Sequence, residues 1–389
     1  MKLRCLTAGE SHGKGLVGIV EGVPAGLEID AAYIDLQLKR RKLGFGRGAR
    51  QAIEPDAVQI WSGVRHGATL GSPIAMIVEN RDWPAWQEVM QPGRCEAQAP
   101  CAVRVPRPGH ADLAGAIKYS HADLRNVMER SSARETTMRV ALGSVARRLI
   151  EECGVQVASR VLQVGPIEDA SAAEVSVEGL NARADASPMR CLGAEAEAAM
   201  MAEVERCREL GDTIGGIFEV RVGGVPIGLG SHVQWDRRLE GEIARQVLAL
   251  NAVQGVEIGM GFAASRERGS RVHDELLAGS EAGRVRYASN RSGGINGGMT
   301  TGQTLVVRAA MKPIPTLGRP LRSVCLETNE PAAAPVERAD TCAVPAAAVI
   351  AESLIALVIA DALLDKFGGD SMHELLPRVR EWNDATRSR

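Results

Sequence analysis

Residues 130–143 read R-S-S-A-R-E-T-T-M-R-V-A-L-G, and they predict the start of a long helix that runs into the core. Ser132 and Glu135 match the capping-box pattern of a helix start, and an apolar run follows them. Backbone N–H groups at a helix start lack partners and attract anions, and Arg130 and Arg134 add positive charge there. The stretch therefore predicts a phosphate or carboxylate site, with an ordinary capped helix and solvated arginines as the alternative.

The composition narrows the class of protein. A chain of 389 residues that is 45% hydrophobic could form one large domain or several ordinary ones. Because only 3% of the residues are aromatic, the core is expected to be aliphatic. A net charge of −2 gives no global field for nucleic acid or a membrane, so any attraction for anions must come from local arginine clusters.

The cysteines and the apolar segments indicate the cellular setting. The eight cysteines form no C-x-x-C pair and no metal-like spacing, which favours reduced thiols in the cytoplasm and predicts no metal site. Met1 leads straight into a strand-like segment, so no signal peptide is expected. Glu352 and Asp361 interrupt the apolar residues 343–364, which therefore predict a buried helix rather than a membrane span.

A turn near the N-terminus, G-E-S-H-G at residues 9–13, admits two interpretations. Ser11 occupies the nucleophile position of the hydrolase pattern G-x-S-x-G, which requires a strand before the turn and a helix after it. Residues 15–23 instead look like a second strand. We therefore expect a β-hairpin with Ser11 and His12 at its tip, and a Ser/His hydrolase that uses Ser11 is kept as the alternative.

A second turn mixes glycines with basic residues, because residues 39–50 read K-R-R-K-L-G-F-G-R-G-A-R. Glycines let the backbone approach a ligand closely, and the forked guanidinium groups of Arg41, Arg47 and Arg50 match phosphate and carboxylate. A basic lid over an anionic ligand is predicted. A nucleic-acid patch is the alternative, which the scarcity of aromatic residues disfavours.

A third turn, R-P-G-H-A-D at residues 107–112, places an arginine, a histidine and an aspartate together. His110 could act as a general acid near neutral pH if a leaving phosphate lay beside it, and a purely structural histidine is the alternative. Residues 82–102 are expected to form an irregular surface loop, and residues 265–292 a flexible polar insertion.

A faint internal repeat predicts the organisation of the chain. G-I-V-E-G-V-P-A-G-L at residues 18–27 resembles F-E-V-R-V-G-G-V-P-I-G-L at residues 218–229, and each half closes with a long predicted helix. We expect two similar β-rich halves, about residues 1–200 and 210–367, related by approximate two-fold symmetry and packed through helices. Two such halves need a shared core, so a single domain over residues 1–389 is predicted, with its core at about residues 3–367.

Taken together, the turns occur in the order seen in the chorismate synthase family, which this sequence resembles from about residue 3 to residue 367. The motifs are G-E-S-H-G, G-F-G-R-G-A-R, R-H-G, R-P-G-H-A-D, R-S-S-A-R-E-T-T-M-R, N-A-V-Q-G-V-E-I-G, G-G-M-T-T-G, M-K-P-I-P-T and E-R-A-D-T-C-A-V-P. The resemblance implies a lyase of the shikimate pathway that converts 5-enolpyruvylshikimate 3-phosphate to chorismate and phosphate with reduced FMN. It also implies an α+β fold, a β-α-β sandwich with antiparallel sheets on central helices, and a cytoplasmic homotetramer.

The resemblance further implies roles for individual residues. His110 would assist the departing phosphate, His12 would manage protons at the flavin, and Asp340 would help to remove a proton at the flavin N5. The residues implied to bind substrate are Arg41, Arg47, Arg50, Arg107 and Arg134. The residues implied to bind flavin are Arg130, Ser131, Ser132, Asn251, Ala252, Gly297, Lys312, Pro313, Ile314, Pro315, Thr316 and Arg338.

The sequence admits two sources of the electrons that reduce the flavin. Arg41 and Arg47 also align with positions described as NADPH-binding in the family, so NADPH is a possible indirect reductant. The same arginines are needed for substrate, which favours a separate flavin reductase as partner. A flavin-binding module without catalysis is the non-enzymatic alternative, although His12, His110 and Asp340 are all present.

Overall fold

The first sheet is built from four antiparallel strands in the order β1-β2-β6-β3. The computed structural model describes residues 3–48, 54–94, 102–171, 175–279, 285–337 and 339–387. The strands are β1 (Arg4–Gly9), β2 (Gly15–Glu21), β3 (Val58–Ile60) and β6 (Ile74–Glu79). Side chains alternate across a strand, and in β2 Leu16 and Val20 are buried whereas Val17 and Ile19 are exposed. This sheet therefore covers the core with one face only.

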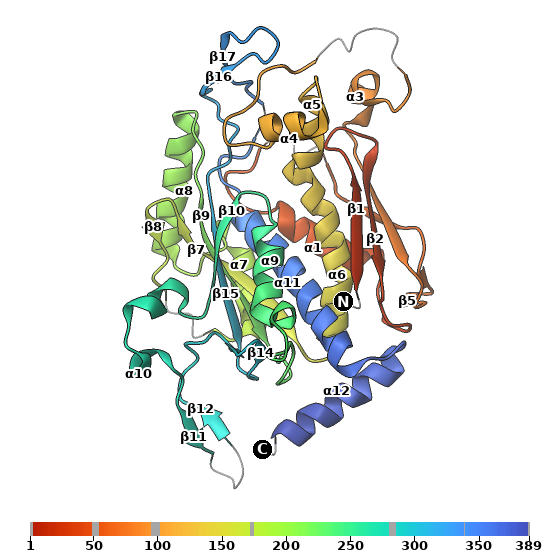
Figure 1. Ribbon diagram of the computed structural model, residues 1–389, viewed down its shortest axis with the longest axis vertical. Coiled ribbons are helices and arrows are strands. Elements are labelled where there is room, and N and C mark those ends of the chain that lie inside the picture. Colours follow the sequence, from red (N-terminus) through yellow and green to blue (C-terminus); the bar gives the residue numbers. More distant parts are fainter. Residues whose placement is uncertain are drawn as a thin grey trace.

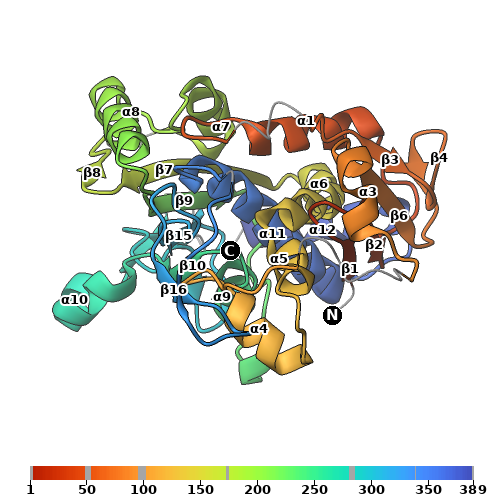
Figure 2. The ribbon, with the colours of Figure 1, turned by 90° about the horizontal axis from the view of Figure 1, so that it is seen from above.

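The second sheet has five antiparallel strands in the order β10-β15-β9-β7-β8. They are β7 (Gln156–Val164), β8 (Ile167–Glu168), β9 (Gly216–Gly223), β10 (Val253–Ile258) and β15 (Leu305–Met311). The buried side chains of β9 are Phe218, Val220 and Val222 on its inner face, together with Glu219 on the outer face. Figures 1 and 2 show the two sheets on opposite sides of a layer of helices, as expected for the predicted α+β sandwich.

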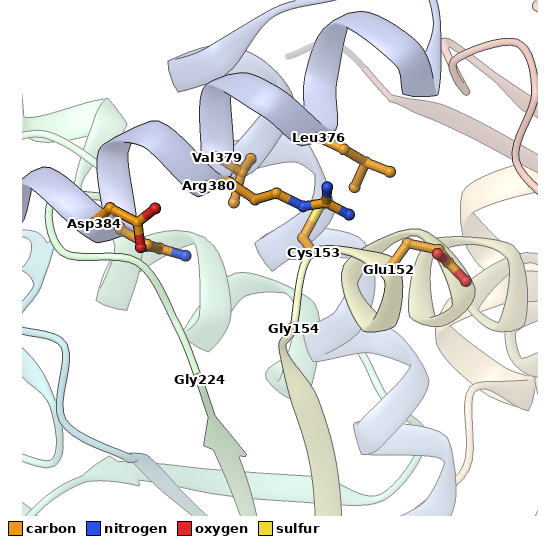
Figure 3. A pocket seen from close by; sticks show the side chains of 9 residues that line it. Glu152, Cys153, Gly154, Gly224, Leu376, Val379, Arg380 and Asp384 are labelled. Atoms are coloured by element: carbon orange, nitrogen blue, oxygen red, sulfur yellow. The ribbon is translucent and has the colours of Figure 1, made fainter.

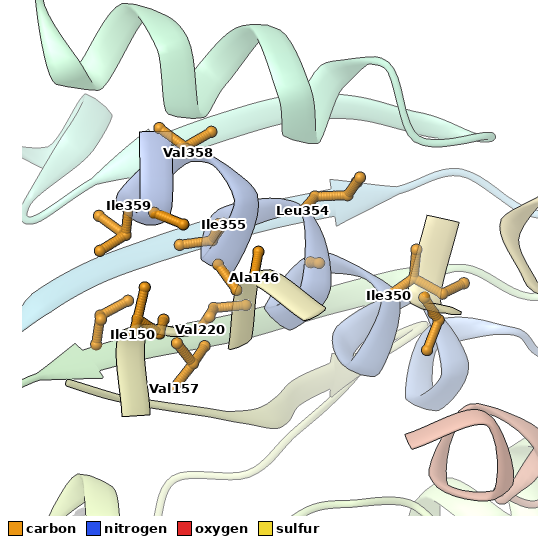
Figure 4. Close-up of a cluster of buried hydrophobic side chains, with 14 of the residues drawn as sticks. Ala146, Ile150, Val157, Val220, Ile350, Leu354, Ile355, Val358 and Ile359 are labelled. Carbon is orange, nitrogen blue, oxygen red and sulfur yellow. The ribbon is translucent and has the colours of Figure 1, made fainter. Parts of the chain in front are cut away.

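The helical layer centres on α6 (Thr136–Glu152) and α11 (Val344–Phe367), with α1 (Ala31–Lys42) and α9 (Leu239–Leu248) packed beside them. Figure 4 shows apolar side chains of α6 and α11 in one cluster with side chains of β7 and β9. At the crossing of α6 and α11, a Cβ added to Gly143 would lie 2.5 Å from the Cβ of Ser353. A glycine at position 143 is thus what lets the two helices approach so closely.

By its length and composition α11 could cross a membrane, yet 83% of its most apolar 18-residue stretch is buried inside the protein. It also carries a buried carboxylate, Glu352, which accepts hydrogen bonds from Arg40 at 2.8 Å and Arg147 at 2.5 Å. Burial raises the pKa of Glu352, but the charges of Arg40 and Arg147 more than offset burial and hold the pKa well below its usual value. Helix α11 is therefore a core helix, and ion pairs from α1 and α6 bind it.

The two halves follow one plan, as the sequence repeat predicts. The order β1-β2-β6-β3 in the first sheet corresponds to β7-β9-β15-β10 in the second. The turn after each central strand is also repeated. Thr69 Oγ1 donates to the Pro24 carbonyl at 2.6 Å, and Thr300 Oγ1 donates to the Pro226 carbonyl at 2.6 Å.

Several expectations for the connecting segments need correction. Residues 82–102 are not irregular throughout, because α3 (Trp83–Met90) forms there, with Pro84 in its first turn. The insertion predicted at residues 265–292 contains α10 (Gly269–Val272) and a hairpin of β11 (Leu276–Ala278) and β12 (Val285–Tyr287), which projects from the body in Figure 1. Beyond the predicted core, α12 (Met372–Arg387) follows α11.

The remaining elements connect the layers. They are β4 (Val64–Arg65), β5 (Ala68–Thr69), α4 (Asp112–Tyr119), α5 (Arg125–Ser131), η1 (Ala133–Glu135), α7 (Val177–Ala186), α8 (Ala194–Glu209), η2 (Trp235–Arg237), η3 (Gly261–Arg266), β13 (Ile295–Asn296), β14 (Met299–Thr300), β16 (Arg322–Val324) and β17 (Pro331–Ala333).

Candidate active site

The last turn of α1 and the segment after it contact the starts of the two central helices. Arg41 donates from Nη2 to the Ala133 carbonyl, just before α6, at 3.1 Å. Seven residues later, the Gly48 amide donates to Asp340, just before α11, at 2.6 Å. The starts of α6 and α11 therefore lie at the same end of the molecule, where both helix dipoles favour negative charge.

The helix start predicted at Ser132 is more complex than a capping box. Helix α5 ends at Ser131, the chain bends at Ser132, and one 3-10 turn leads into α6. Ser132 Oγ accepts from the Arg134 amide at 3.3 Å, but Glu135 pairs with Arg139 at 2.9 Å instead of closing the box. The bend matters because it directs Ser132 Oγ toward Ser11 Oγ, 3.1 Å away.

Ser11 and His12 lie at the tip of the β1–β2 hairpin, as predicted. Ser11 is buried, and the strand after it rules out the strand–turn–helix context of a hydrolase nucleophile. The Nδ1 atom of His12 lies 2.9 Å and 3.0 Å from the two carboxylate oxygens of Glu129. On its face the His12 ring stacks on Trp86, with 4.0 Å between ring centroids.

His110 lies in a second histidine–carboxylate pair. Its Nδ1 is 2.6 Å from Asp112 Oδ1, and Arg107 Nε donates to Asp112 Oδ2 at 2.9 Å. Burial raises the pKa of Asp112, but hydrogen bonds from His110 and Arg107 more than offset burial and hold the pKa well below its usual value. Asp112 is therefore ionised and fixes the ring of His110.

The turn that holds His110 also contacts the predicted flavin residues 312–316. Lys312 Nζ donates to the Gly109 carbonyl at 2.9 Å, and Arg107 Nη1 donates to Thr316 Oγ1 at 3.3 Å. A Cβ on Gly109 would lie 3.4 Å from Pro315. Within the same turn, Pro313 is exposed and the Ile314 carbonyl accepts from Thr213 at 2.7 Å.

Arg41 and Arg134 are buried arginines that share one acidic partner, Asp56. Arg134 Nη1 donates to Asp56 Oδ1, and Arg41 Nη1 lies 3.5 Å from Asp56 Oδ2. Burial lowers the pKa of Arg41 to about 10. Arg134 Nη2 lies 3.6 Å from Glu54 Oε2. Within the described part of the chain, Arg41 Nη1 and Arg134 Nη2 thus form ion pairs but no hydrogen bond, so each arginine retains a donor for a ligand.

Arg47 and Asp340 form an ion pair with 2.8 Å between Nη1 and Oδ2. Arg47 Nε is buried and has no acceptor among the described residues. Arg50 and Arg338, which the sequence also assigns to the site, lie outside the described residues.

The predicted flavin residues from the two halves touch one another. Asn251 Nδ2 donates to the Ser131 carbonyl at 3.1 Å, and the Lys312 amide donates to the Ala252 carbonyl at 2.9 Å. Ala252 has a φ of +65°, which is uncommon for a residue with a Cβ. Arg130 instead binds the end of β1, donating to the Gly9 carbonyl at 3.0 Å.

Gly297, another predicted flavin residue, lies beyond the opposite end of α9 from Asn251. It lies in the β13–β14 hairpin, next to Gly298, whose carbonyl accepts from the amide of Leu239 at the start of α9. Asn251 follows the other end of α9, a helix of ten residues. At about 1.5 Å per residue, α9 separates the two by about 15 Å.

Three side chains of the site are not predicted by the sequence: Glu129, Asp56 and Trp86. Glu129 directly precedes the R-S-S motif and Asp56 follows the basic turn, so their positions offered a weak signal. Their roles depend on contacts across the fold, such as the 117 residues between His12 and Glu129, which no local pattern reveals.

A surface cleft of about 440 Å³ lies elsewhere, at the C-terminal end of α6. Figure 3 shows Glu152 and Cys153 on one side of this cleft and Leu376, Val379 and Arg380 of α12 on the other. It is lined by none of the predicted site residues. Among the described residues, no group of three or more His, Cys, Asp or Glu side chains is placed to hold a metal ion.

Comparison with known proteins gives the family context. A family model described as chorismate synthase matches residues 3–364. The chorismate synthase of Symbiobacterium thermophilum is 54% identical over 383 residues, covering 97% of this chain and 98% of the relative. That of Desulforudis audaxviator is 54% identical over 386 residues, covering 99% and 98%. A crystal structure of chorismate synthase matches with a TM-score of 0.80 at 39% identity, covering 100% of this chain and 99% of that chain.

Proposed function

The chain belongs to the chorismate synthase family, and we propose that the side chains gathered where α6 and α11 begin are its active site. The enzyme is a lyase that eliminates phosphate from 5-enolpyruvylshikimate 3-phosphate and forms chorismate. The observation that carries the site assignment is the contact between the His110 turn and Lys312. It joins the predicted proton donor to the predicted flavin residues from the other half of the chain.

The arginines account for the charge of the substrate, which carries a phosphate and two carboxylates. Guanidinium groups bind such anions through paired hydrogen bonds. Arg41, Arg47 and Arg134 are each held by a carboxylate yet retain a buried N–H without an acceptor among the described residues. We assign these N–H groups to the substrate, together with Arg107 and Arg50.

His110 is the proton donor for the departing phosphate. Ionised Asp112 can only accept, so the Nδ1 of His110 carries the proton of that hydrogen bond. When the ring is protonated at both nitrogens, Nε2, which lies 3.3 Å from Arg107 Nη2, is the atom that delivers a proton to the leaving oxygen. Arg107 donates to Asp112 at 2.9 Å and places a positive charge beside this position, which favours a leaving phosphate.

The residues around Asn251 fit a flavin. Asn251 Oδ1 is buried and has no donor among the described residues, which suits an N–H group of an isoalloxazine ring. Lys312 adds a positive charge that would stabilise the anionic form of a reduced flavin. Reduced FMN, when bound, supplies an electron transiently and takes it back, so the elimination involves no net redox change.

His12 and Asp340 handle protons on the flavin side of this arrangement. His12 is held by Glu129 on the first half of the chain, and Asp340 is held by Arg47 and by the Gly48 amide at the start of α11. We assign the removal of a proton from the flavin N5 to Asp340. The burial of Arg41 and its bond to Thr136 at 2.9 Å favour a separate flavin reductase over direct NADPH binding.

We also assign the protein to the cytoplasm as a homotetramer. Apolar side chains that no described part of the chain covers support association. On the outer face of the first sheet, Leu6 is 70% exposed beside its strand partner Ile19 at 38%, and on the projecting hairpin Leu276 is 63% and Val285 60% exposed. Such patches are typical of surfaces that meet another subunit.

The activity is tested under strictly anaerobic conditions with dithionite-reduced FMN and 5-enolpyruvylshikimate 3-phosphate. Chorismate formation, followed by absorbance, is the expected result. Absence of product with flavin bound would instead support the alternative of a flavin-binding module without catalysis. Labelling of Ser11 by an organophosphate is the outcome that a hydrolase would give.

A further inference from the structure

Glu129 contacts both the imidazole and the backbone of His12. Besides the two contacts to Nδ1, Glu129 Oε2 accepts from the His12 amide at 2.8 Å. The Glu129 carbonyl accepts from the Ser11 amide at 3.0 Å. The Glu129 side chain is only 4% exposed, so a buried residue of α5 binds both Ser11 and His12 at the hairpin tip.

One face of the His12 ring stacks on an aromatic ring, which in turn lies next to a cationic group. Trp86 of α3 stacks on His12 with an angle of 30° between the rings. The Arg125 guanidinium lies 5.1 Å from the Trp86 ring, and its Nη1 is 3.4 Å from Glu129 Oε1. Glu129 of α5 is therefore a charged group in direct contact with the His12 ring, Arg125 of α5 lies beside Glu129 and Trp86, and α3 contributes Trp86.

We propose that Glu129 is the positioning residue of His12, which fixes the proton on Nδ1 and thereby makes Nε2 the nitrogen that exchanges protons with the ligand. A carboxylate accepts hydrogen bonds and cannot donate them, so both contacts to Nδ1 require an Nδ1–H. Burial raises the pKa of Glu129, but the hydrogen bonds and charge of His12 outweigh burial and lower the pKa. The inference rests on the proposed role of His12 at the flavin.

The pair formed by His110 and Asp112 supports this assignment independently. There too a buried carboxylate meets Nδ1, at 2.6 Å, whereas Nε2 lies 3.3 Å from Arg107 Nη2 and contacts no carboxylate among the described residues. The two pairs come from different parts of the chain, the first from the hairpin tip and α5 and the second from the turn before α4. A shared tautomer is therefore a property of the site rather than of one local turn.

The first test needs neither substrate nor flavin. ¹⁵N spectra are recorded on the full-length protein labelled at histidine, with the His12 signals assigned by their loss in His12→Asn. We expect the proton of the neutral His12 imidazole to lie on Nδ1, and Nε2 to carry none. A neutral His12 with its proton on Nε2 would overturn the proposal, whatever the activity of the enzyme.

The second test uses Glu129→Gln in the anaerobic assay. An amide can donate as well as accept, so it also allows the other tautomer, and kcat should fall about 10- to 100-fold while KM for the substrate changes little. Glu129→Asp keeps the carboxylate and should recover part of the turnover. Glu135→Gln removes a buried carboxylate that pairs with Arg139, and it should leave the His12 spectrum unchanged.

The outcomes distinguish the role of Glu129 from the proposed activity of the enzyme. An unchanged kcat in Glu129→Gln, or a His12 spectrum that responds equally to Glu135→Gln, contradicts positioning by Glu129. If Glu129→Gln does not fold, the wild-type spectrum and Glu129→Asp decide. An inactive wild-type enzyme with the expected tautomer would contradict the proposed function and leave the role of Glu129 supported.

Discussion

Lys312 donates from Nζ to the carbonyl oxygen of Gly109 at 2.9 Å. Lys312 follows β15 in the second half, whereas Gly109 belongs to the turn before α4 in the first half. The contact places a positive charge beside His110 and ties together two segments that are 203 residues apart. The candidate site is therefore assembled at the junction of the two halves.

Replacing Lys312 tests its assignment to the flavin. We expect Lys312→Met to weaken the binding of reduced FMN about 10- to 100-fold, since a hydrogen bond to a charged group contributes about 1.5–3 kcal/mol. Flavin titration under anaerobic conditions measures the change. Lys366→Gln, at the far end of α11 over Trp382, is the control and should bind flavin as wild type does. Equal affinities in all three proteins would remove Lys312 from the flavin site.

The crossing of α6 and α11 can be tested with a pair of helical glycines. Gly143→Ala should destabilise the protein by about 1–3 kcal/mol, because the added Cβ meets Ser353. Gly241→Ala in α9 meets nothing within 4 Å and should stabilise by about 0.4–1 kcal/mol. Chemical denaturation of both variants gives the two values. A neutral Gly143→Ala would mean that the helices do not cross as described.

The buried carboxylate of Glu352 predicts a dependence of stability on pH. Its pKa is lowered in the folded protein, so its stabilising effect is complete above the unfolded value of about 4.3 and is lost as pH falls through the folded value. Glu352→Gln should cost about 3–5 kcal/mol at pH 7, and the difference from wild type should shrink in acid.

Urea unfolding at neutral and acid pH measures this difference for Glu352. The surface pair of Glu205 and Arg208 provides the control, since Glu205→Gln should change stability by less than about 0.5 kcal/mol. A wild-type advantage over Glu352→Gln that persists undiminished in acid would contradict the assigned ionisation.

We propose that the chain is one folding unit, residues 1–389 with a core at about 3–367. A fragment of residues 1–200 contains β7 without β9, its partner in the second sheet. It also leaves the face of α6 that packs on α11 uncovered. The fragment should therefore lack a cooperative unfolding transition by circular dichroism. A sharp transition would instead show that the first half folds alone.

Local patterns predicted a large part of this architecture. The hairpin at Ser11 and His12 and the buried helix over the apolar residues 343–364 both follow from turn chemistry and periodicity. The repeat was visible because each half needs the same turn, in which Thr69 and Thr300 bind equivalent carbonyls.

Features that depend on contacts between distant segments were not predictable. The bend at Ser132 replaces a simple helix start because Ser132 meets Ser11, 121 residues away. Asp56 adopts a φ of +53° beside Arg134, and nothing in its sequence neighbours signals this. The acidic partners of Arg134 and His12 lie 78 and 117 residues away along the chain, so no local pattern predicted them.

The rate of chorismate formation by His110→Ala, measured anaerobically with reduced FMN at saturating substrate, tests whether His110 is the proton donor for the departing phosphate. His121→Ala, a histidine that follows α4 and contacts Tyr119, is the matched control and should keep wild-type turnover. If His110 is the general acid, His110→Ala lowers turnover about 10²- to 10⁴-fold, while flavin affinity stays unchanged. Wild-type turnover in His110→Ala would contradict that role.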